Sequence, residues 1–201
     1  MLRGILSPCF LQAAGRAGKT KKNVFTFTAN SADPTIPAVG CEGKIVVIST
    51  KNGVVKKETY TDLPLVALSV EADALSEIKI IGNLGSFGVE YGGSSYHGLV
   101  SVNPEECASL LILDINDSDA ITEINISKNP LLESFNGYGC GSIKTIYTIA
   151  QNESVAQGVA DMISTSAADT GTVYVNSTDP YYGTIETAAQ AASWTIMPLL
   201  S

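Results

Sequence analysis

The stretch that decides the fold runs from residue 110 to residue 148 and reads LLILDINDSDAITEINISKNPLLESFNGYGCGSIKTIYT. Its apolar residues recur in the pattern apolar-x-x-apolar-x-apolar. The copies begin 11 residues apart, at Leu110, Ile121, Leu132 and Ile143. Eleven residues hold one short strand and one turn, and they are too few for a crossover helix. The repeat therefore predicts coils stacked in parallel, each of which buries its apolar face against the next.

Copies of the same pattern are found from residue 64 onward, and a small residue follows several of them at a fixed distance. It stands three positions after the last strand residue of its copy. An inward asparagine there can satisfy turn backbone groups of adjacent coils, and a cysteine can replace it as a small buried residue. We therefore expect structural roles for Asn83, Cys107, Asn129 and Cys140.

The spacing of the cysteines bears on disulfides. Cys107 and Cys140 would lie three coils apart, at about 14 Å for a strand spacing of about 4.8 Å. A disulfide requires Cα atoms within about 7 Å of each other, so we expect two buried thiols here. The sequence leaves open whether Cys9 and Cys41 form a disulfide.

Three segments carry a resemblance to a known group: IKIIGNLGSF at 78–87, LDI at 113–115 and INISKNPLLESF at 124–135. They resemble the short, irregular leucine-rich-repeat proteins of gut bacteria and their phages, in which the pattern continues L-x-x-L-x-L-x-x-N/C. The resemblance covers about residues 64–198. It implies a solenoid located on a cell surface or in a virion. It also implies a small β-sandwich before the repeats, of which residues 23–63 would be a reduced form.

The segments on either side of the repeats read differently. Residues 23–63 predict a small antiparallel β element, with an alternating strand at 23–28 and a hairpin turn at Asn52-Gly53. Residues 151–201 predict a helix capped by Ser154, a strand at 172–175, a helix at 181–192 and a strand at 194–197. This βαβαβ segment would cap the open end of the repeats.

The expected fold is therefore β-rich with a C-terminal α/β cap. A short-coil, leucine-rich-repeat-like parallel solenoid (64–150) follows the small antiparallel β element (23–63) and an N-terminal arm (1–22), and the cap (151–201) ends the chain.

Charge is distributed unevenly along the 201 residues. Residues 1–22 hold five basic residues and no acidic one, whereas the remaining 179 hold 7 basic and 20 acidic residues. The acidic body should not bind nucleic acid directly, because phosphate binding needs clustered cations. The apolar run of the arm is interrupted, so it predicts a signal peptide poorly and we expect the arm to be retained. Its expected partner contacts are Arg3, Ile5, Leu6, Phe10, Leu11, Arg16, Lys19, Lys21 and Lys22.

Candidate chemistry is sparse. The only histidine, His97, lies in the insertion 91–98, where Tyr91, Tyr96 and His97 suit contact with a partner if the loop is more than a spacer. The sequence holds no nucleotide-binding loop, no nucleophile motif and no C-x-x-C pair. We therefore expect no enzyme, cofactor or metal site, and no membrane span.

Two functions follow as hypotheses. The first is a non-enzymatic structural protein of a multi-copy assembly, with a phage virion as the preferred assembly. It would be a capsid decoration, head-fibre or tail-associated protein that its arm anchors to neighbouring subunits. The alternative is a secreted or cell-surface leucine-rich-repeat adhesion module that binds protein or glycan. The sequence names no host, partner or copy number.

Overall fold

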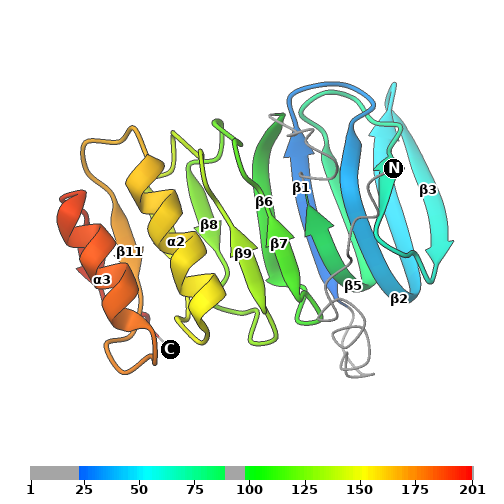
Figure 1. The fold of residues 1–201 in the computed structure, drawn as a ribbon. Coiled ribbons are helices and arrows are strands. Elements are labelled where there is room, and N and C mark those ends of the chain that lie inside the picture. The colour runs from blue at the N-terminus through cyan, green and yellow to red at the C-terminus, as the bar shows by residue number, and fades with distance from the viewer. Residues whose placement is uncertain (1–22, 89–97, 201) are drawn as a thin grey trace, which may run out of the picture.

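The computed structural model describes residues 23–88 and 98–200 (Figure 1). The first half contains β1 (Val24–Ala29), β2 (Thr35–Lys51), β3 (Val54–Thr61), β4 (Val66–Ser69), β5 (Glu77–Gly88) and β6 (Leu99–Glu106). Short strands follow: β7 (Ile112–Asp114), β8 (Glu123–Asn125), β9 (Ser134–Asn136) and β10 (Thr145–Tyr147). The chain ends with α2 (Glu153–Thr165), β11 (Thr172–Tyr174), α3 (Tyr182–Ala191) and β12 (Thr195–Met197).

The larger sheet has eight strands, five of which run in the order β3-β2-β5-β1-β6 with antiparallel pairing. Strand β4 joins β2, and the short strands β7 and β9 continue from β5 in parallel. Alternation explains long parts of these strands, because every second residue is buried from Ile45 to Ser49 in β2 and at Ile78 and Ile80 in β5. The hairpin between β2 and β3 turns at Asn52 and Gly53, which both have positive φ.

The smaller sheet has four parallel strands in the order β12-β11-β10-β8. Each of these strands has three residues, and its middle residue points into the core. Those residues are Ile124, Ile146, Val173 and Ile196, of which the first three are buried and the last is half-buried.

The predicted solenoid is wrong, and the finding that overturns it is the large sheet with mainly antiparallel pairing. The repeat pattern also fits Leu75, Ile78 and Ile80. However, Ile78 and Ile80 lie in β5, which pairs antiparallel with β1 and β2, and Leu75, which the repeat would bury, is 64% exposed. Among the 11-residue copies, sheet neighbours are not consecutive. Leu113 pairs with Phe135 and Ile124 pairs with Ile146, so neighbours in one sheet are 22 residues apart. Successive copies alternate between the two sheets.

One apolar core joins the two sheets. The rings of Phe25 and Phe27 pack on that of Phe87, with centroids 4.5 and 5.2 Å away. After β9, helices α2 and α3 continue the layer formed by β7 and β9. Helix α2 packs on β9 on one side and on α3 on the other (Figure 1). Helix α2 is capped by Asn152, whose Oδ1 accepts a hydrogen bond of 2.9 Å from the Val155 amide, and not by Ser154 as expected.

The four residues expected to form one structural column do not do so. Asn83 lies inside strand β5 and accepts a hydrogen bond from Asn23. Cys107 and Asn129 lie together, because Asn129 donates to the Cys107 carbonyl. Cys140 lies in the other set of turns, where its thiol donates to the Ile115 carbonyl. Because successive copies alternate between the sheets, consecutive turns lie on different sides of the molecule. Residues 11 positions apart therefore fall into two separate groups, one with Cys107 and Asn129 and the other with Cys140.

Candidate functional site

The side of the four-stranded sheet that points away from the core forms the candidate surface. In each strand the middle residue is directed inward, so the first and third residues point outward. Strand register aligns the third residues in one row and the first residues in another. We call this surface the outer face; it consists of Glu123, Asn125, Thr145, Tyr147, Thr172, Tyr174, Thr195 and Met197.

Two stacked tyrosines occupy the centre of the outer face. Tyr147 and Tyr174 are directly paired on neighbouring strands, and their ring centroids lie 4.4 Å apart with an angle of 9° between the planes. Both side chains are half-buried, and Met197, next in the row, is 43% exposed. The two rings cover one another's facing sides, and with Met197 they form a compact, largely apolar platform with hydroxyl groups.

Carboxylates lie near this platform. Partial desolvation raises the pKa of the Tyr147 hydroxyl, and the negative charge of Glu123 on the neighbouring strand raises it further. Tyr174 and the more distant Glu105 add smaller contributions of the same sign. Tyr147 therefore remains a neutral phenol at physiological pH, beside a region of negative potential.

A cleft of about 240 Å³ adjoins the outer face where the two sheets meet. In the described part of the chain, β6 pairs only with β1 and β8 only with β10, so no strand ladder closes the space between β6 and β8. The lining is mostly polar. It consists of Val100, Ser101, Val102, Asn103 and Glu105 on one side and Thr122, Glu123 and Asn125 on the other.

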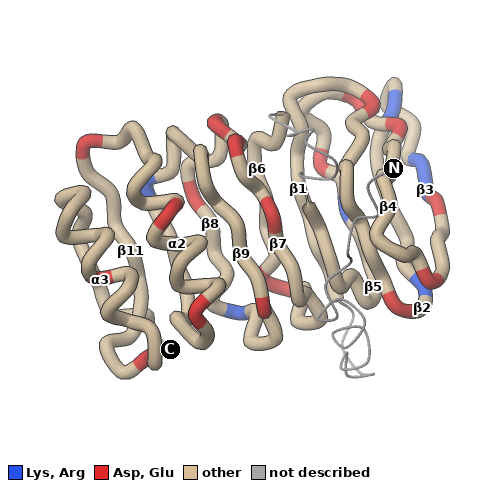
Figure 2. The backbone as a smooth tube through the Cα atoms, viewed as in Figure 1, with Lys and Arg blue, Asp and Glu red and all other residues tan. Residues whose placement is uncertain are grey.

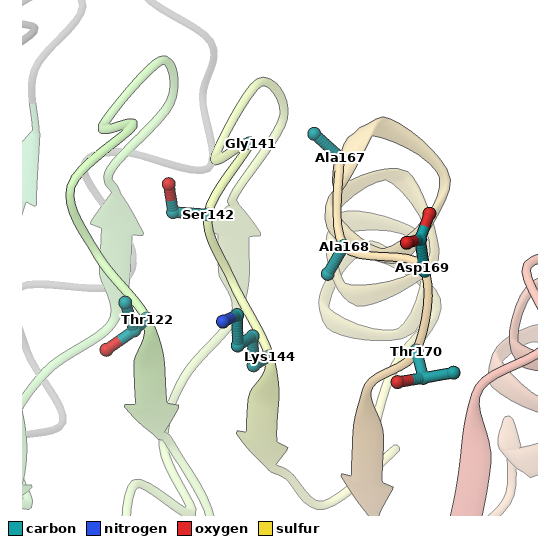
Figure 3. A pocket seen from close by; sticks show the side chains of 8 residues that line it. All are labelled: Thr122, Gly141, Ser142, Lys144, Ala167, Ala168, Asp169 and Thr170. Atoms are coloured by element: carbon teal, nitrogen blue, oxygen red, sulfur yellow. The ribbon is translucent and has the colours of Figure 1, made fainter.

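A second depression, of about 590 Å³, lies where the parallel strands begin (Figure 3). Thr122 and Lys144 immediately precede β8 and β10, and the segment 167–170 borders the depression on the α2 side. Lys144 is its one cation and Asp169 its one anion among the lining residues. The other lining residues are small, and the depression is open and shallow.

The charge of the molecule changes sharply along its length (Figure 2). Residues 98–200 hold 12 acidic residues and only two lysines, a balance of −10. Residues 23–88 hold seven acidic residues and five lysines, a balance of −2. Four of these lysines lie on β2 and β3, at the end of the larger sheet farthest from the outer face, and the fifth lies on the central strand β5. The outer face thus belongs to the strongly acidic half.

All of the predicted partner contacts lie outside the described residues. These are the nine arm residues, from Arg3 to Lys22, and the loop residues Tyr91, Tyr96 and His97. Their roles stay predictions. Sequence reasoning missed Tyr147 and Tyr174, although each stands in a polar–apolar–polar triplet of the form T-apolar-Y. The 26 residues between them, which include α2, concealed that they are neighbours.

The thiols expected to be buried are buried. Cys41, Cys107 and Cys140 are free cysteines in the core, and Cys9 lies outside the described residues. Desolvation raises the pKa of Cys107 to about 11 and that of Cys140 to about 12. Both are therefore protonated at neutral pH and are poor nucleophiles.

The described residues contain neither a metal-ligating cluster nor a membrane-spanning helix. Residues 23–88 and 98–200 contain no group of three or more His, Cys, Asp or Glu side chains placed to hold a metal ion. No helix within these ranges is long and apolar enough to cross a membrane.

Comparisons of the chain with protein-family models, curated proteins and solved structures find no match. The resemblance to leucine-rich-repeat proteins therefore stays a prediction.

Proposed function

We propose that this chain is a non-enzymatic structural protein of a multi-subunit assembly, with a phage virion as the preferred assembly. Its N-terminal arm would anchor it to a neighbouring subunit. The observation that carries the proposal is the separation of charge, from five cations in residues 1–22 to a balance of −10 in residues 98–200. Complementary potentials steer association and disfavour contact between like ends.

The chemistry of the described surface agrees with a role in contact. The outer face presents threonine, tyrosine and asparagine side chains, which suit hydrogen bonding and packing against a partner. The buried thiols are held in the protonated form, so they do not serve as nucleophiles at neutral pH.

The test is whether the protein is a stoichiometric component of a particle. Nuclease-treated particles from cells that naturally express the chain are separated on a density gradient, and an antibody against residues 23–201 locates it. We expect the chain to co-sediment with particles that enclose nucleic acid, and immunogold labels to mark them. A chain found only in the soluble fraction or on cell envelopes would overturn the proposal.

A second candidate is a secreted or cell-surface adhesion module, and the stacked pair Tyr147 and Tyr174 favours it. Sugar rings and protein side chains both pack on exposed aromatic platforms. Glycan-array binding by the wild type, lost in Tyr147→Ala/Tyr174→Ala but kept in Tyr138→Ala, would support this function. Tyr138 is a suitable control because it is 56% exposed and lies in a turn away from the outer face.

A further inference from the structure

We propose that the outer face, together with the cleft between β6 and β8, is the docking surface for the basic arm (residues 1–22) of a second copy of this chain. The inference rests on the proposed function and deepens it, since it names the partner and both contacting surfaces.

The docking surface offers two kinds of contact side by side. Tyr147, Tyr174 and Met197 form an apolar row on the outer face, and Glu105 and Glu123 contribute negative charge at the cleft. The cleft is lined mainly by polar side chains, among them Ser101, Asn103 and Asn125, which can form hydrogen bonds with an extended segment lying across it.

The composition of the arm is the complement of this surface. Five cations and no acidic residue accompany the apolar side chains of Ile5, Leu6, Phe10 and Leu11. Cations can pair with the two carboxylates and can also pack on tyrosine rings. The apolar side chains can cover the platform. A nucleic acid or an acidic protein would instead be repelled by the half of the body to which this surface belongs.

The position where the arm joins the body, and the length of the arm, are both compatible with docking on a second copy. It joins the body at Asn23, next to Val24, which pairs with Glu106 at the end of β6. A segment of 22 residues spans up to about 70 Å when extended. The distance from β6 across β8 to β10 is two strand spacings, about 10 Å. The arm is therefore long enough to leave its own body and cross the docking surface of another.

Docking between copies has a structural consequence. Each chain has one arm and one docking surface, so a pair of chains leaves one of each unused. The contact is heterologous and repeats head to tail, giving a ring if the rotation closes and a filament if it does not. This arrangement also brings the basic arm of one chain onto the acidic half of the next.

The experiment measures two properties of the full chain over about a hundredfold range of concentration. Sedimentation equilibrium gives the association constant, and limited trypsin digestion reports access to the bonds after Arg16, Lys19, Lys21 and Lys22. The surface variants are Glu105→Lys/Glu123→Lys and Tyr147→Ala/Tyr174→Ala. The matched controls are Glu42→Lys/Glu133→Lys, at two exposed sites away from the docking surface, and Tyr138→Ala. Thermal unfolding verifies that every variant is folded.

We expect association of the wild type to slow cleavage of the arm as concentration rises. Both surface variants should weaken association by about tenfold or more and restore cleavage, whereas the controls should not. Excess synthetic peptide of sequence 1–22 should dissociate the oligomer, and a peptide of the same composition in scrambled order should not. This second comparison separates docking of a specific segment from general attraction between charges.

Three results would overturn the inference in distinguishable ways. Protection of the arm that is independent of concentration would place it on its own body. Concentration-dependent protection that survives both surface variants would place it on another surface and leave the proposed assembly intact. A monomer with a freely cleaved arm, whose outer face binds a glycan instead, would exclude docking between copies, and particle co-sedimentation would then decide the proposed function separately.

Discussion

The side chain of Asn129 donates a hydrogen bond of 2.9 Å to the carbonyl oxygen of Cys107, which lies 22 residues earlier in the chain. The same amide nitrogen donates to the Pro104 carbonyl at 2.8 Å. Asn129 is 1% exposed, so no solvent replaces these bonds. Gln151, another 22 residues on, donates in turn to the Asn129 carbonyl at 3.3 Å. Side-chain amides thus connect three successive turns on one side of the molecule.

Replacing Asn129 by alanine is expected to destabilise the protein strongly. The substitution removes two buried hydrogen bonds, while the Pro104 and Cys107 carbonyls each keep a backbone donor, so the expected cost is about 1–3 kcal/mol. The measurement is urea unfolding followed by circular dichroism. Asn103→Ala is the control, because Asn103 is exposed and its change should lie within about 0.5 kcal/mol of the wild type. Equal stability of the two variants would contradict the role given to Asn129.

The connection between these turns shows which part of the fold the sequence could predict. Positions 107, 129 and 151 are multiples of 11 apart, as are 118 and 140, so the repeat itself is visible in the sequence. Its physical meaning is not. An 11-residue period is compatible with one strand per coil or with alternation between two sheets, because both bury the same apolar residues. The strand pairings distinguish them, because Leu113 pairs with Phe135 and Ile124 pairs with Ile146.

The long strands were misread for a related reason. The residues of β5 satisfy the repeat pattern and also alternate with a period of two, since Ile78 and Ile80 fit both. Pairing with β1 and β2 decides the outcome, and that contact is distant in sequence. The outer face could not be predicted from the sequence, because its two tyrosines are separated by α2 along the chain. They become neighbours only when α2 lies in the other layer and β10 pairs with β11.

The glycine of helix α2 offers a test of how that helix packs. A Cβ atom at Gly158 would lie 2.0 Å from the carbonyl oxygen of Phe135 in β9, a backbone atom that cannot move alone. Gly158→Ala is therefore expected to push α2 off the sheet and to lower the free energy of unfolding by about 1–3 kcal/mol or more.

Gly183 supplies the matched control. It lies in helix α3, and a Cβ there would meet nothing within 4 Å. Gly183→Ala should stabilise the protein by up to about 1 kcal/mol, because alanine is the better helix former. Thermal unfolding of both variants makes the comparison. If the two substitutions had the same effect, α2 would not pack as closely on β9 as described.

The buried thiols predict the behaviour of the protein at alkaline pH. Burial raises the pKa of Cys107 from 9.0 to about 11 and that of Cys140 from 9.0 to about 12. Between pH 9 and 11 the unfolded chain releases these protons while the folded chain keeps them. The folded state then binds more protons, so the free energy of unfolding falls as pH rises through this window.

Removing one of the thiols should make that fall less steep. In Cys107→Ala the free energy of unfolding should fall less steeply with pH, by at most about 1.4 kcal/mol per pH unit. This difference in slope does not depend on what the substitution costs at neutral pH. Denaturant unfolding at several pH values gives the slope, and Asn103→Ala, which removes no titrating group, should keep that of the wild type. An unchanged slope in Cys107→Ala would mean that this thiol ionises in the folded protein.

Gly171 and Trp194 provide an optical test of the C-terminal edge. A Cβ atom at Gly171 would lie 2.5 Å from the Trp194 indole, and the amide of the next residue, Thr195, donates to the Gly171 carbonyl at 2.8 Å. Trp194 is the only tryptophan and is 6% exposed, so fluorescence reports this site alone. Gly171→Ala should displace the ring, shift its emission to longer wavelength and cost about 1–3 kcal/mol.

The same substitution also tests how the edge strand is held. Because the indole and the Thr195 amide both contact Gly171, displacing the ring should weaken the pairing of β11 with β12. Hydrogen exchange of the Thr195 and Val175 amides, which donate to the Gly171 and Met197 carbonyls across this pairing, should therefore accelerate in Gly171→Ala and not in Gly183→Ala. Unchanged emission together with unchanged exchange would contradict the contact between Gly171 and Trp194. A shift in emission with unchanged exchange would show instead that backbone pairing alone keeps β12 in place.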